Sequence, residues 1–180
     1  MPDTEIRDLP ATPLTPDAFA PYGSVISPMQ DGTAFGPQDA ALHLGGGTPR
    51  FYCMRLPNRG QVIRHITRHR QVTQVLASAG GLPWLLAVAP PPAEDIADAE
   101  PPLQAIRAFQ IPGDAAVMLR RGAWHAGPLF ESREANFFNL ELSDTNVTDH
   151  WSCDLAKRYG VALRIVTCPS PVAFASPPRP

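Results

Sequence analysis

Proline and glycine restrict what this chain can fold into more than any other feature. The 180 residues include 22 prolines and 13 glycines. They recur so often that few segments could form a helix of more than about three turns. The chain is long enough for one sizeable hydrophobic core, and nothing in it requires a second. We therefore expect a single domain over residues 1–180, with 1–10 and 170–180 extended or frayed.

Short apolar runs between turn residues predict the strands. Each run is rich in β-branched or aromatic residues, and together they cover 50–56, 61–69, 73–78, 83–89, 105–111, 115–120, 136–142 and 161–167. Helix signals occur only at 14–23, where Thr15 precedes Pro16, and at 152–160, which ends in Gly160. The pattern predicts an all-β fold, a cupin-like antiparallel barrel or jelly roll with short N- and C-terminal helices.

Charge and cysteine content narrow the range of partners. With 15 basic and 17 acidic residues, the formal net charge of −2 creates no field that would attract nucleic acid or an anionic membrane. No apolar run is long enough to cross a bilayer. Cys53, Cys153 and Cys168 are widely spaced and form no C-x-x-C pair, which argues against a disulfide framework. We expect a cytoplasmic protein that acts on a small molecule, with 90–102 as a solvated, acidic, proline-rich loop.

The strand at 61–69 carries the first candidate site. Small barrels hold ligands on side chains that point inward from the strands. Strand alternation places Ile63, His65, Thr67 and His69 on one face, and Val62, Arg64, Ile66 and Arg68 on the other. Two histidines on one face either bind a ligand or lie on a half-exposed sheet surface. Both interpretations stay open for His65, whereas the surrounding sequence favours a functional His69.

A second candidate site lies in the stretch RRGAWHAGP, residues 120–128. If the turn at Gly122 directs this segment into the mouth of the barrel, His125 and either Arg120 or Arg121 would face the same ligand. Arginine binds a carboxylate through two parallel hydrogen bonds, and histidine transfers protons near neutral pH. Trp124 would either line the pocket or pack in the core. The alternative for the arginine pair is a solvent-exposed turn.

These two segments match the spacing of the cupin metal motifs, but with weaker donors. Thr67 and Gln74 stand where a histidine and a carboxylate would be, which leaves His69 and His125 as the strong donors. Two imidazoles and an amide form a weak site for zinc or iron, so a divalent ion at His69, Gln74 and His125 would be loosely held. Asp144 and Asp149 are the nearest carboxylates that could orient a histidine, although helix capping is the stronger expectation for Asp149.

The sequence resembles the ureidoglycolate lyase (ureidoglycolate hydrolase) family over nearly its whole length. The resemblance rests on LTPDAFAPYGSVI, RHRQVTQ, LPWLLAVAP, AIRAF and RRGAWH. It implies a cupin-like barrel, a homodimer, and the cleavage of ureidoglycolate to glyoxylate and urea in purine (allantoin) nitrogen salvage. Residues Arg68-His69 and Gln74 match the family's R-H…Q segment, and Arg121, Trp124 and His125 match its R-x-x-W-H ending.

From the motifs and the resemblance we expect two groups of site residues. The catalytic group is His69, His125 and Gln74; the substrate-binding group is Arg68, Arg120, Arg121, Trp124 and Asp144. Thr67 and Arg120 depart from the family pattern, as does the segment 140–160. These departures leave three alternatives open: a relative that has drifted to another small acid, a metal-dependent cupin isomerase or dioxygenase, and a non-catalytic cupin that binds a small acid.

Overall fold

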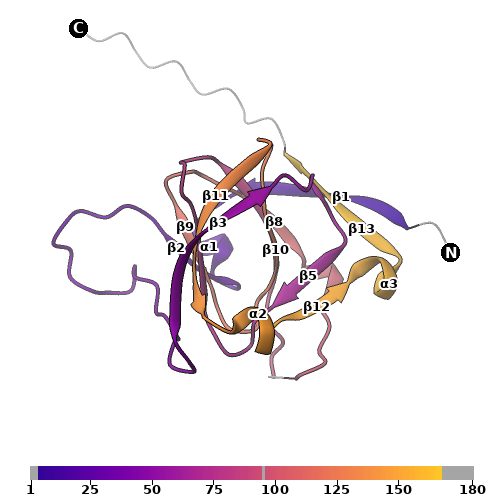
Figure 1. Ribbon diagram of the computed structural model, residues 1–180. Helices are drawn as coiled ribbons and strands as arrows, with labels where there is room; N and C mark the ends of the chain where they lie inside the picture. The colour runs from indigo at the N-terminus through magenta and orange to yellow at the C-terminus, as the bar shows by residue number, and fades with distance from the viewer. Residues whose placement is uncertain (1–3, 95, 168–180) are drawn as a thin grey trace, which may run out of the picture.

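The computed structural model describes residues 4–94 and 96–167, and their fold is mostly β (Figure 1). The strands form an eight-stranded sheet and a five-stranded sheet. Helical segments in the described residues are short: α1 (Pro16–Phe19), η1 (Leu103–Ala105), α2 (Thr145–Thr148) and α3 (Leu155–Tyr159). The predicted all-β, cupin-like class is confirmed. None of the helices in these two ranges has the length and apolar composition that a bilayer crossing requires.

Strand order defines the two layers. The eight-stranded sheet runs in the order β12 (Trp151–Asp154), β5 (His65–Arg68), β10 (Trp124–Leu129), β7 (Trp84–Ala89), β8 (Arg107–Ile111), β1 (Glu5–Pro13), β13 (Val161–Thr167) and β4 (Val62–Ile63). The five-stranded sheet runs in the order β2 (Gly23–Ile26), β9 (Ala116–Leu119), β6 (Gln74–Ser78), β11 (Glu134–Leu142) and β3 (Pro49–Pro57).

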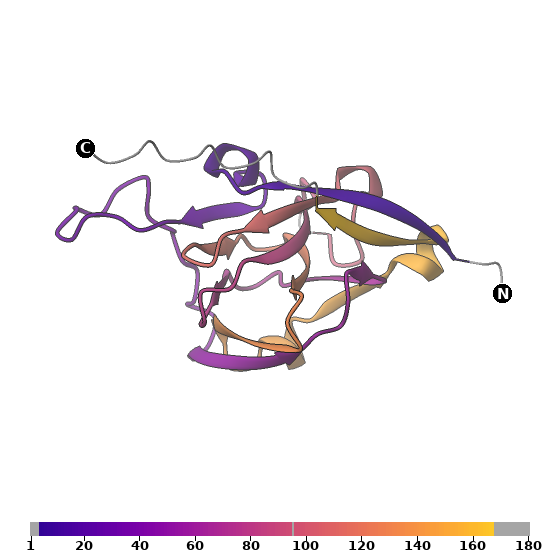
Figure 2. The same cartoon turned by 90° about the horizontal axis from the view of Figure 1, so that it is seen from above.

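Strand β1 departs from the antiparallel arrangement that the sequence predicts. It pairs in parallel with both β13 and β8, and both views show it beside β13 (Figures 1 and 2). Pro10 and Pro13 interrupt its sequence, and a strand that contains prolines is hard to recognise from pattern alone. The N-terminal residues 5–10, expected to be extended or frayed, are extended within this strand; 170–180 lie outside the described residues.

Two apolar cores hold the sheets in place, and strand β7 contributes to both. Trp84, Leu86 and Val88 face the core between the sheets, whereas Leu85, Ala87 and Ala89 face a second core on the other side of the eight-stranded sheet. Every residue of β7 is buried, as expected for a strand that is covered on both faces.

The predicted strand at 61–69 divides into two strands. Strand β4 pairs with β13, whereas β5 pairs with β10 and β12. The alternation therefore breaks at Arg64, and Ile63 and Ile66 are both buried in the second core. From His65 onward the predicted alternation is correct, which places Thr67 and His69 on the face opposite Arg68.

The capping signals identified two helices, and both are shorter than expected: residues 152–154, predicted to be helical, belong to strand β12. The Thr15 hydroxyl accepts a hydrogen bond from the Ala18 amide at the start of α1, yet the helix ends at Phe19 rather than near Gly23. Helix α3 ends at Gly160, whose φ of 69° is left-handed. Helix α2 and strands β2, β10 and β12 were not predicted: α2, β2 and β12 have four residues each, and β10 contains Gly127 and Pro128, which are typical of turns.

Candidate functional site

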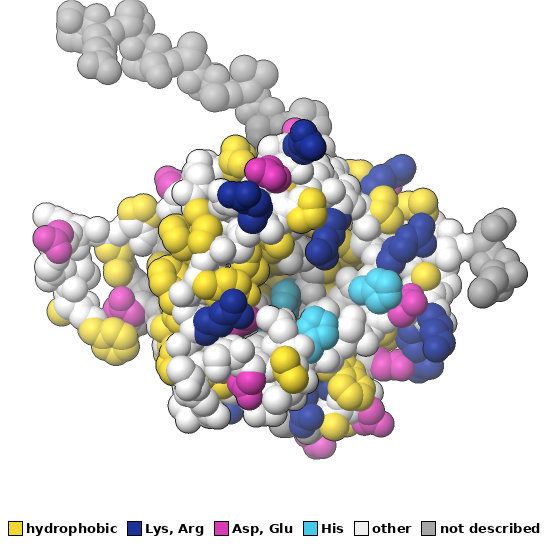
Figure 3. Space-filling model, in the orientation of Figure 1, with side chains coloured by type: hydrophobic (Ala, Val, Ile, Leu, Met, Phe, Trp, Pro, Cys, Tyr) yellow, Lys and Arg dark blue, Asp and Glu magenta, His cyan; other side chains and the backbone are white. Residues whose placement is uncertain are grey.

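The candidate site is a cavity of about 680 Å³ between the two sheets. Figure 3 shows the surface hollowed in this region, with histidine side chains within and around the hollow. The wall from the five-stranded sheet comes from β3, β6 and β11, and the opposite wall comes from β5 and β10. The lining includes Tyr52, Met54, Arg59, Arg64, His65, Thr67, His69, Gln74, His125, Asn139, Glu141, Asn146 and His150.

Strands β5 and β10 bring His69 and His125 together, although the two residues are 56 positions apart in the sequence. His125 lies opposite Thr67 in the strand pairing, and the His69 and His125 ring centroids are 5.2 Å apart. The two side chains are 5% and 8% exposed. His150 is a third imidazole nearby, with its ring centroid 5.8 Å from that of His69.

Asp149 fixes the orientation of His69. The Asp149 carbonyl oxygen lies 2.6 Å from His69 Nδ1. Because a carbonyl oxygen can only accept, Nδ1 carries the proton and the neutral ring keeps its free lone pair on Nε2. The Asp149 carboxylate accepts hydrogen bonds of 2.8 Å from the Arg70 and Gln71 amides. Asp149 therefore caps the turn that follows His69, and it orients the histidine through its backbone.

Burial keeps both histidines in their neutral forms. Desolvation lowers the pKa of His69, and this is opposed by the Asp149 hydrogen bond and by the negative charges of Asp149 and Glu141. Desolvation and the nearby His69 lower the pKa of His125 to about 3. At neutral pH each ring can therefore accept a proton, and the surrounding charges favour His69 as the acceptor.

Glu141 is a buried carboxylate that the sequence analysis missed. It is 1% exposed and lines the cavity. Its Oε2 accepts a hydrogen bond of 3.0 Å from Gln74 Nε2. Its Oε1 accepts from the Tyr52 hydroxyl and from Asn146 Nδ2, each at 3.1 Å. Three donors compensate the cost of burying the charge.

Strand alternation in 136–142 carries a signal that points to Glu141. Ala135 and Phe137 are buried in the core, and Asn139 and Glu141 continue the same face of β11. Polar residues in phase with buried apolar ones indicate either an internal hydrogen-bond network or a site. Asn139 belongs to the same network, because its Nδ2 donates to the Tyr52 hydroxyl oxygen at 3.1 Å.

Arg68 and Trp124 do not line the cavity. Arg68 is fully buried on the opposite face of β5, where it donates hydrogen bonds to the carbonyl oxygens of Ile96 and Ala97. Its guanidinium carbon lies 4.8 Å from the centre of the Trp124 ring, which is itself buried in the second core. Arg68 thus anchors the 90–102 loop, and the substrate-binding role expected for these two residues does not fit their position.

Arg120, Arg121 and Asp144 also lie outside the cavity lining. Both arginines are exposed, and Arg120 donates a hydrogen bond to the Ala20 carbonyl. Asp144 is exposed and accepts a hydrogen bond of 3.1 Å from the Thr148 hydroxyl. The turn at Gly122 brings His125 into the cavity and leaves the preceding arginines in solvent.

The arginines that do line the cavity are Arg59 and Arg64, neither of which we singled out from sequence. Both are exposed. The neighbouring His65 Nε2 lies 3.6 Å from an Asp154 carboxylate oxygen. The cationic groups of the cavity are therefore found at its exposed margin, while His69, Gln74, His125 and Glu141 are buried.

The side chains that line the cavity are weak ligands for a metal ion. His69, Gln74 and His125 line the same cavity, but within residues 4–94 and 96–167 no group of three or more His, Cys, Asp or Glu side chains is arranged to hold one. The loosely held divalent ion stays a prediction. No step that we propose below depends on it.

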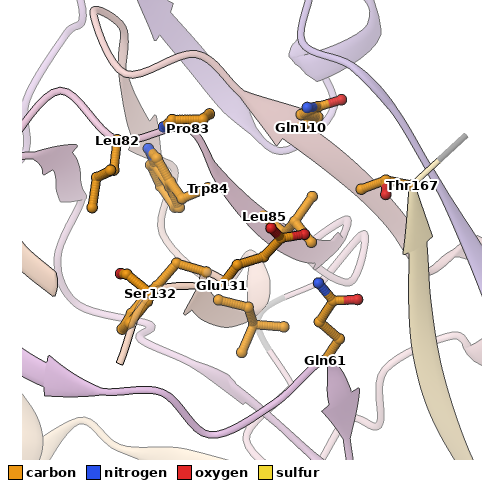
Figure 4. A pocket seen from close by; sticks show the side chains of 11 residues that line it. Gln61, Leu82, Pro83, Trp84, Leu85, Gln110, Glu131, Ser132 and Thr167 are labelled. Atoms are coloured by element: carbon orange, nitrogen blue, oxygen red, sulfur yellow. The ribbon is translucent and has the colours of Figure 1, made fainter. Parts of the chain in front are cut away.

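A second, smaller cavity of about 260 Å³ is lined by residues of β7, β8, β10 and β13 and of the segment after β10 (Figure 4). Trp84, Leu85, Gln110 and Thr167 line it together with Glu131. Glu131 is its one titratable group in the described part of the chain. This cavity has no pair of groups that could move a proton between two sites, so the larger cavity is the better candidate for chemistry.

The fold and the larger cavity define a cupin-like β protein with a histidine-lined cavity between its two sheets. The sequence profile of the ureidoglycolate lyase family matches residues 6–157. The chain belongs to this family.

Curated relatives agree with the family assignment. A ureidoglycolate lyase of Pseudomonas syringae pv. tomato (strain ATCC BAA-871 / DC3000) is 29% identical over 167 residues, covering 81% of this chain and 91% of that protein. Proteins of the same name from Pseudomonas putida (strain W619) and Pseudomonas entomophila (strain L48) are 28% identical, covering 81% of this chain and 92% of each.

Proposed function

We propose that this protein is a carbon–nitrogen lyase that cleaves ureidoglycolate to glyoxylate and urea. The observation that carries the proposal is the pair of buried, neutral histidines, His69 and His125, whose ring centroids are 5.2 Å apart in one cavity. The cavity volume of about 680 Å³ suits a small ligand. Membership of the ureidoglycolate lyase family supports this substrate over other small acids.

The reaction needs one proton to be removed and one to be delivered. The carbon next to the carboxylate bears a hydroxyl and a ureido nitrogen. When a base takes the hydroxyl proton, the C–O bond becomes a carbonyl and the C–N bond breaks. The electron pair of that bond goes to the ureido nitrogen, which takes up a proton and leaves as urea. No covalent intermediate with the protein is needed.

His69 is the base in this proposal. Its Nδ1–H donates to the Asp149 carbonyl, so Nε2 is free to accept the hydroxyl proton. The negative charges of Asp149 and Glu141 raise the pKa of His69 against the effect of burial, and they stabilise the imidazolium as it forms. The same Nε2–H then protonates the departing nitrogen. Positioned acid–base catalysis of this kind contributes about 10² to 10⁴ in rate, or about 3 to 5 kcal/mol.

The direct test is to incubate the purified protein with ureidoglycolate and to follow glyoxylate and urea, with and without added divalent metals. We expect both products in equal amounts. Activity that appears only after metal addition would support the metal-dependent alternative. If small carboxylic acids raise the melting temperature but neither product forms, the protein is a small-acid-binding cupin and not a lyase.

A further inference from the structure

Burial separates the charges that line the cavity. Glu141 is 1% exposed and lies at the depth of the cavity. Arg59 and Arg64 are exposed and lie at its mouth. A ligand that enters therefore meets positive charge first and negative charge last. This arrangement of charge determines which end of a substrate is favoured at the deep end of the cavity and which at its mouth.

The deep end favours groups that donate hydrogen bonds. Glu141 Oε1 accepts two hydrogen bonds, but Oε2 accepts only the one from Gln74 among the described residues. An ionised carboxylate is an acceptor only, so a lone pair of Oε2 remains for an N–H donor. The same charge repels a second carboxylate, and the repulsion is strong where water is excluded.

The mouth favours a carboxylate. No carboxylate in residues 4–94 or 96–167 lies within ion-pair distance of Arg59 or Arg64. His65, beside Arg64, is instead paired with Asp154. A guanidinium group binds a carboxylate through two parallel hydrogen bonds, so the two arginines are suited to hold one at the entrance.

We propose that the ligand binds with its ureido group inward, against Glu141 and Gln74, and its carboxylate outward, against Arg64 and Arg59. This assignment rests on the proposed function and defines how the substrate is oriented. Glu141 selects N–H donors over a second carboxylate, and Arg64 supplies affinity for the carboxylate that all such substrates share. The hydroxyl-bearing carbon then lies between these two ends, at the level of His69.

Three ligands of equal heavy-atom count test this orientation. N-carbamoylglycine has the ureido and carboxylate groups of ureidoglycolate but no hydroxyl, so it cannot be cleaved. N-acetylglycine replaces its terminal NH₂ with CH₃, and succinate places O⁻ at the same point and CH₂ in place of the inner N–H. Titration calorimetry on the full chain at neutral pH should show N-carbamoylglycine binding about tenfold or more tightly than either of the others. Equal affinities would overturn the proposal without the need for any variant.

Single-residue variants test separately which side chain binds the ureido end of the ligand and which binds its carboxylate end. Glu141→Gln should remove most of the discrimination against succinate, bringing the affinity ratio to within about threefold of unity. Arg64→Ala should weaken all three ligands by a similar factor of about tenfold and leave their ratios unchanged. Arg133→Ala is the matched control, because Arg133 is exposed outside the cavity lining, and should change nothing. Unchanged ratios in a folded Glu141→Gln protein, or altered ratios in Arg64→Ala, would contradict the assignment.

The binding measurements stand apart from the lyase assay. If ureidoglycolate yields no glyoxylate but N-carbamoylglycine is still preferred and the variants behave as described, the lyase proposal fails and the orientation holds. If products form but the three ligands bind alike, the lyase proposal holds and the orientation is wrong.

Discussion

At the scale of single residues, the two central histidines differ in what surrounds them. His69 Nδ1 is 2.6 Å from the Asp149 carbonyl oxygen, whereas His125 Nδ1 is 3.5 Å from the Ala123 carbonyl oxygen, too far for a strong hydrogen bond. Carboxylates raise the pKa of His69 and do not act on His125. The two rings therefore have different roles, with His69 as the stronger base.

His69→Ala should lower kcat for ureidoglycolate cleavage by about 10² to 10⁴, the range that general acid–base catalysis contributes. The fold should persist, because the change removes one polar ring from the wall of a cavity. Steady-state assays of glyoxylate formation would measure kcat, and circular dichroism would check the fold. His43→Ala is the control, since the His43 side chain is exposed and outside the cavity. Full activity in His69→Ala would remove this residue from the mechanism.

Histidine burial also predicts how stability depends on pH. Burial lowers the folded-state pKa of His125 from its ordinary value of 6.5 to about 3, and it also lowers the pKa of His69. Below pH 6.5 the unfolded chain takes up protons that the folded chain does not, so stability is complete above 6.5 and falls as the pH is lowered toward 3. At pH 5, protonation of the unfolded chain at His125 should lower the free energy of unfolding by about 2 kcal/mol relative to pH 7, and His69 should act in the same direction.

Urea denaturation at pH 7 and pH 5 would measure this effect. His125→Leu, which removes the titrating group, should show a smaller loss of stability between the two pH values than the unaltered chain. An equal loss in both proteins would mean that His125 is not responsible.

At the scale of elements, the turn between β9 and β10 positions the site. Gly122 has a φ of 78°, which favours glycine, and its amide donates a hydrogen bond of 2.6 Å to the His69 carbonyl. The turn thus joins the end of β5 to the start of β10, and both histidines depend on it. The exposed position of Arg120 and Arg121 follows from the same turn, because they precede it.

Gly122→Ala should lower the free energy of unfolding by about 1 to 2 kcal/mol, since alanine is strained at this φ. It should also lower kcat/KM, because the strain falls on the hydrogen bond to His69. Denaturant titration and kinetics would measure the two effects. Gly80→Ala is the control, because an added Cβ at Gly80 meets no atom within 4 Å, and it should leave both quantities nearly unchanged.

At the scale of the whole molecule, several large apolar side chains are exposed and are candidates for the interface of the expected homodimer. Phe51 and Phe138 stack with ring centroids 5.4 Å apart on the outer face of the five-stranded sheet, and they are 68% and 40% exposed. The segment 27–48 extends away from the sheets (Figures 1 and 2), and it carries Phe35, which is 84% exposed. The homodimer that the family resemblance implies stays a prediction. We expect its interface to include the outer face of the five-stranded sheet, around Phe51 and Phe138.

Phe51→Glu should prevent the expected homodimer from forming, because it places a charge in the centre of the expected interface. Light scattering coupled to size-exclusion chromatography would give the mass. Val147→Glu is the control, since Val147 is an exposed apolar residue in α2. A dimer that survives Phe51→Glu would place the interface elsewhere, and a monomeric unaltered chain would contradict the homodimer prediction itself.

The sequence alone determined the local features of this protein. Proline and glycine spacing fixed the β class, and apolar runs located most strands. Capping chemistry at Thr15 and Gly160 located two helix ends. These features depend on neighbouring residues, so they can be read along the chain. Alternation in β5 also separates Arg68 from His69, although the family motif led us to expect both in one site.

Only the tertiary structure decided which polar side chains meet. Glu141, Gln74 and Tyr52 come from three strands, and pairing across the five-stranded sheet brings them together. Arg68 is buried on the outer face of its sheet, and Arg64, at the break between β4 and β5, lines the cavity instead. The reason is physical: alternation along a strand defines two faces, but the partner strands and the opposing sheet decide which face encloses the cavity.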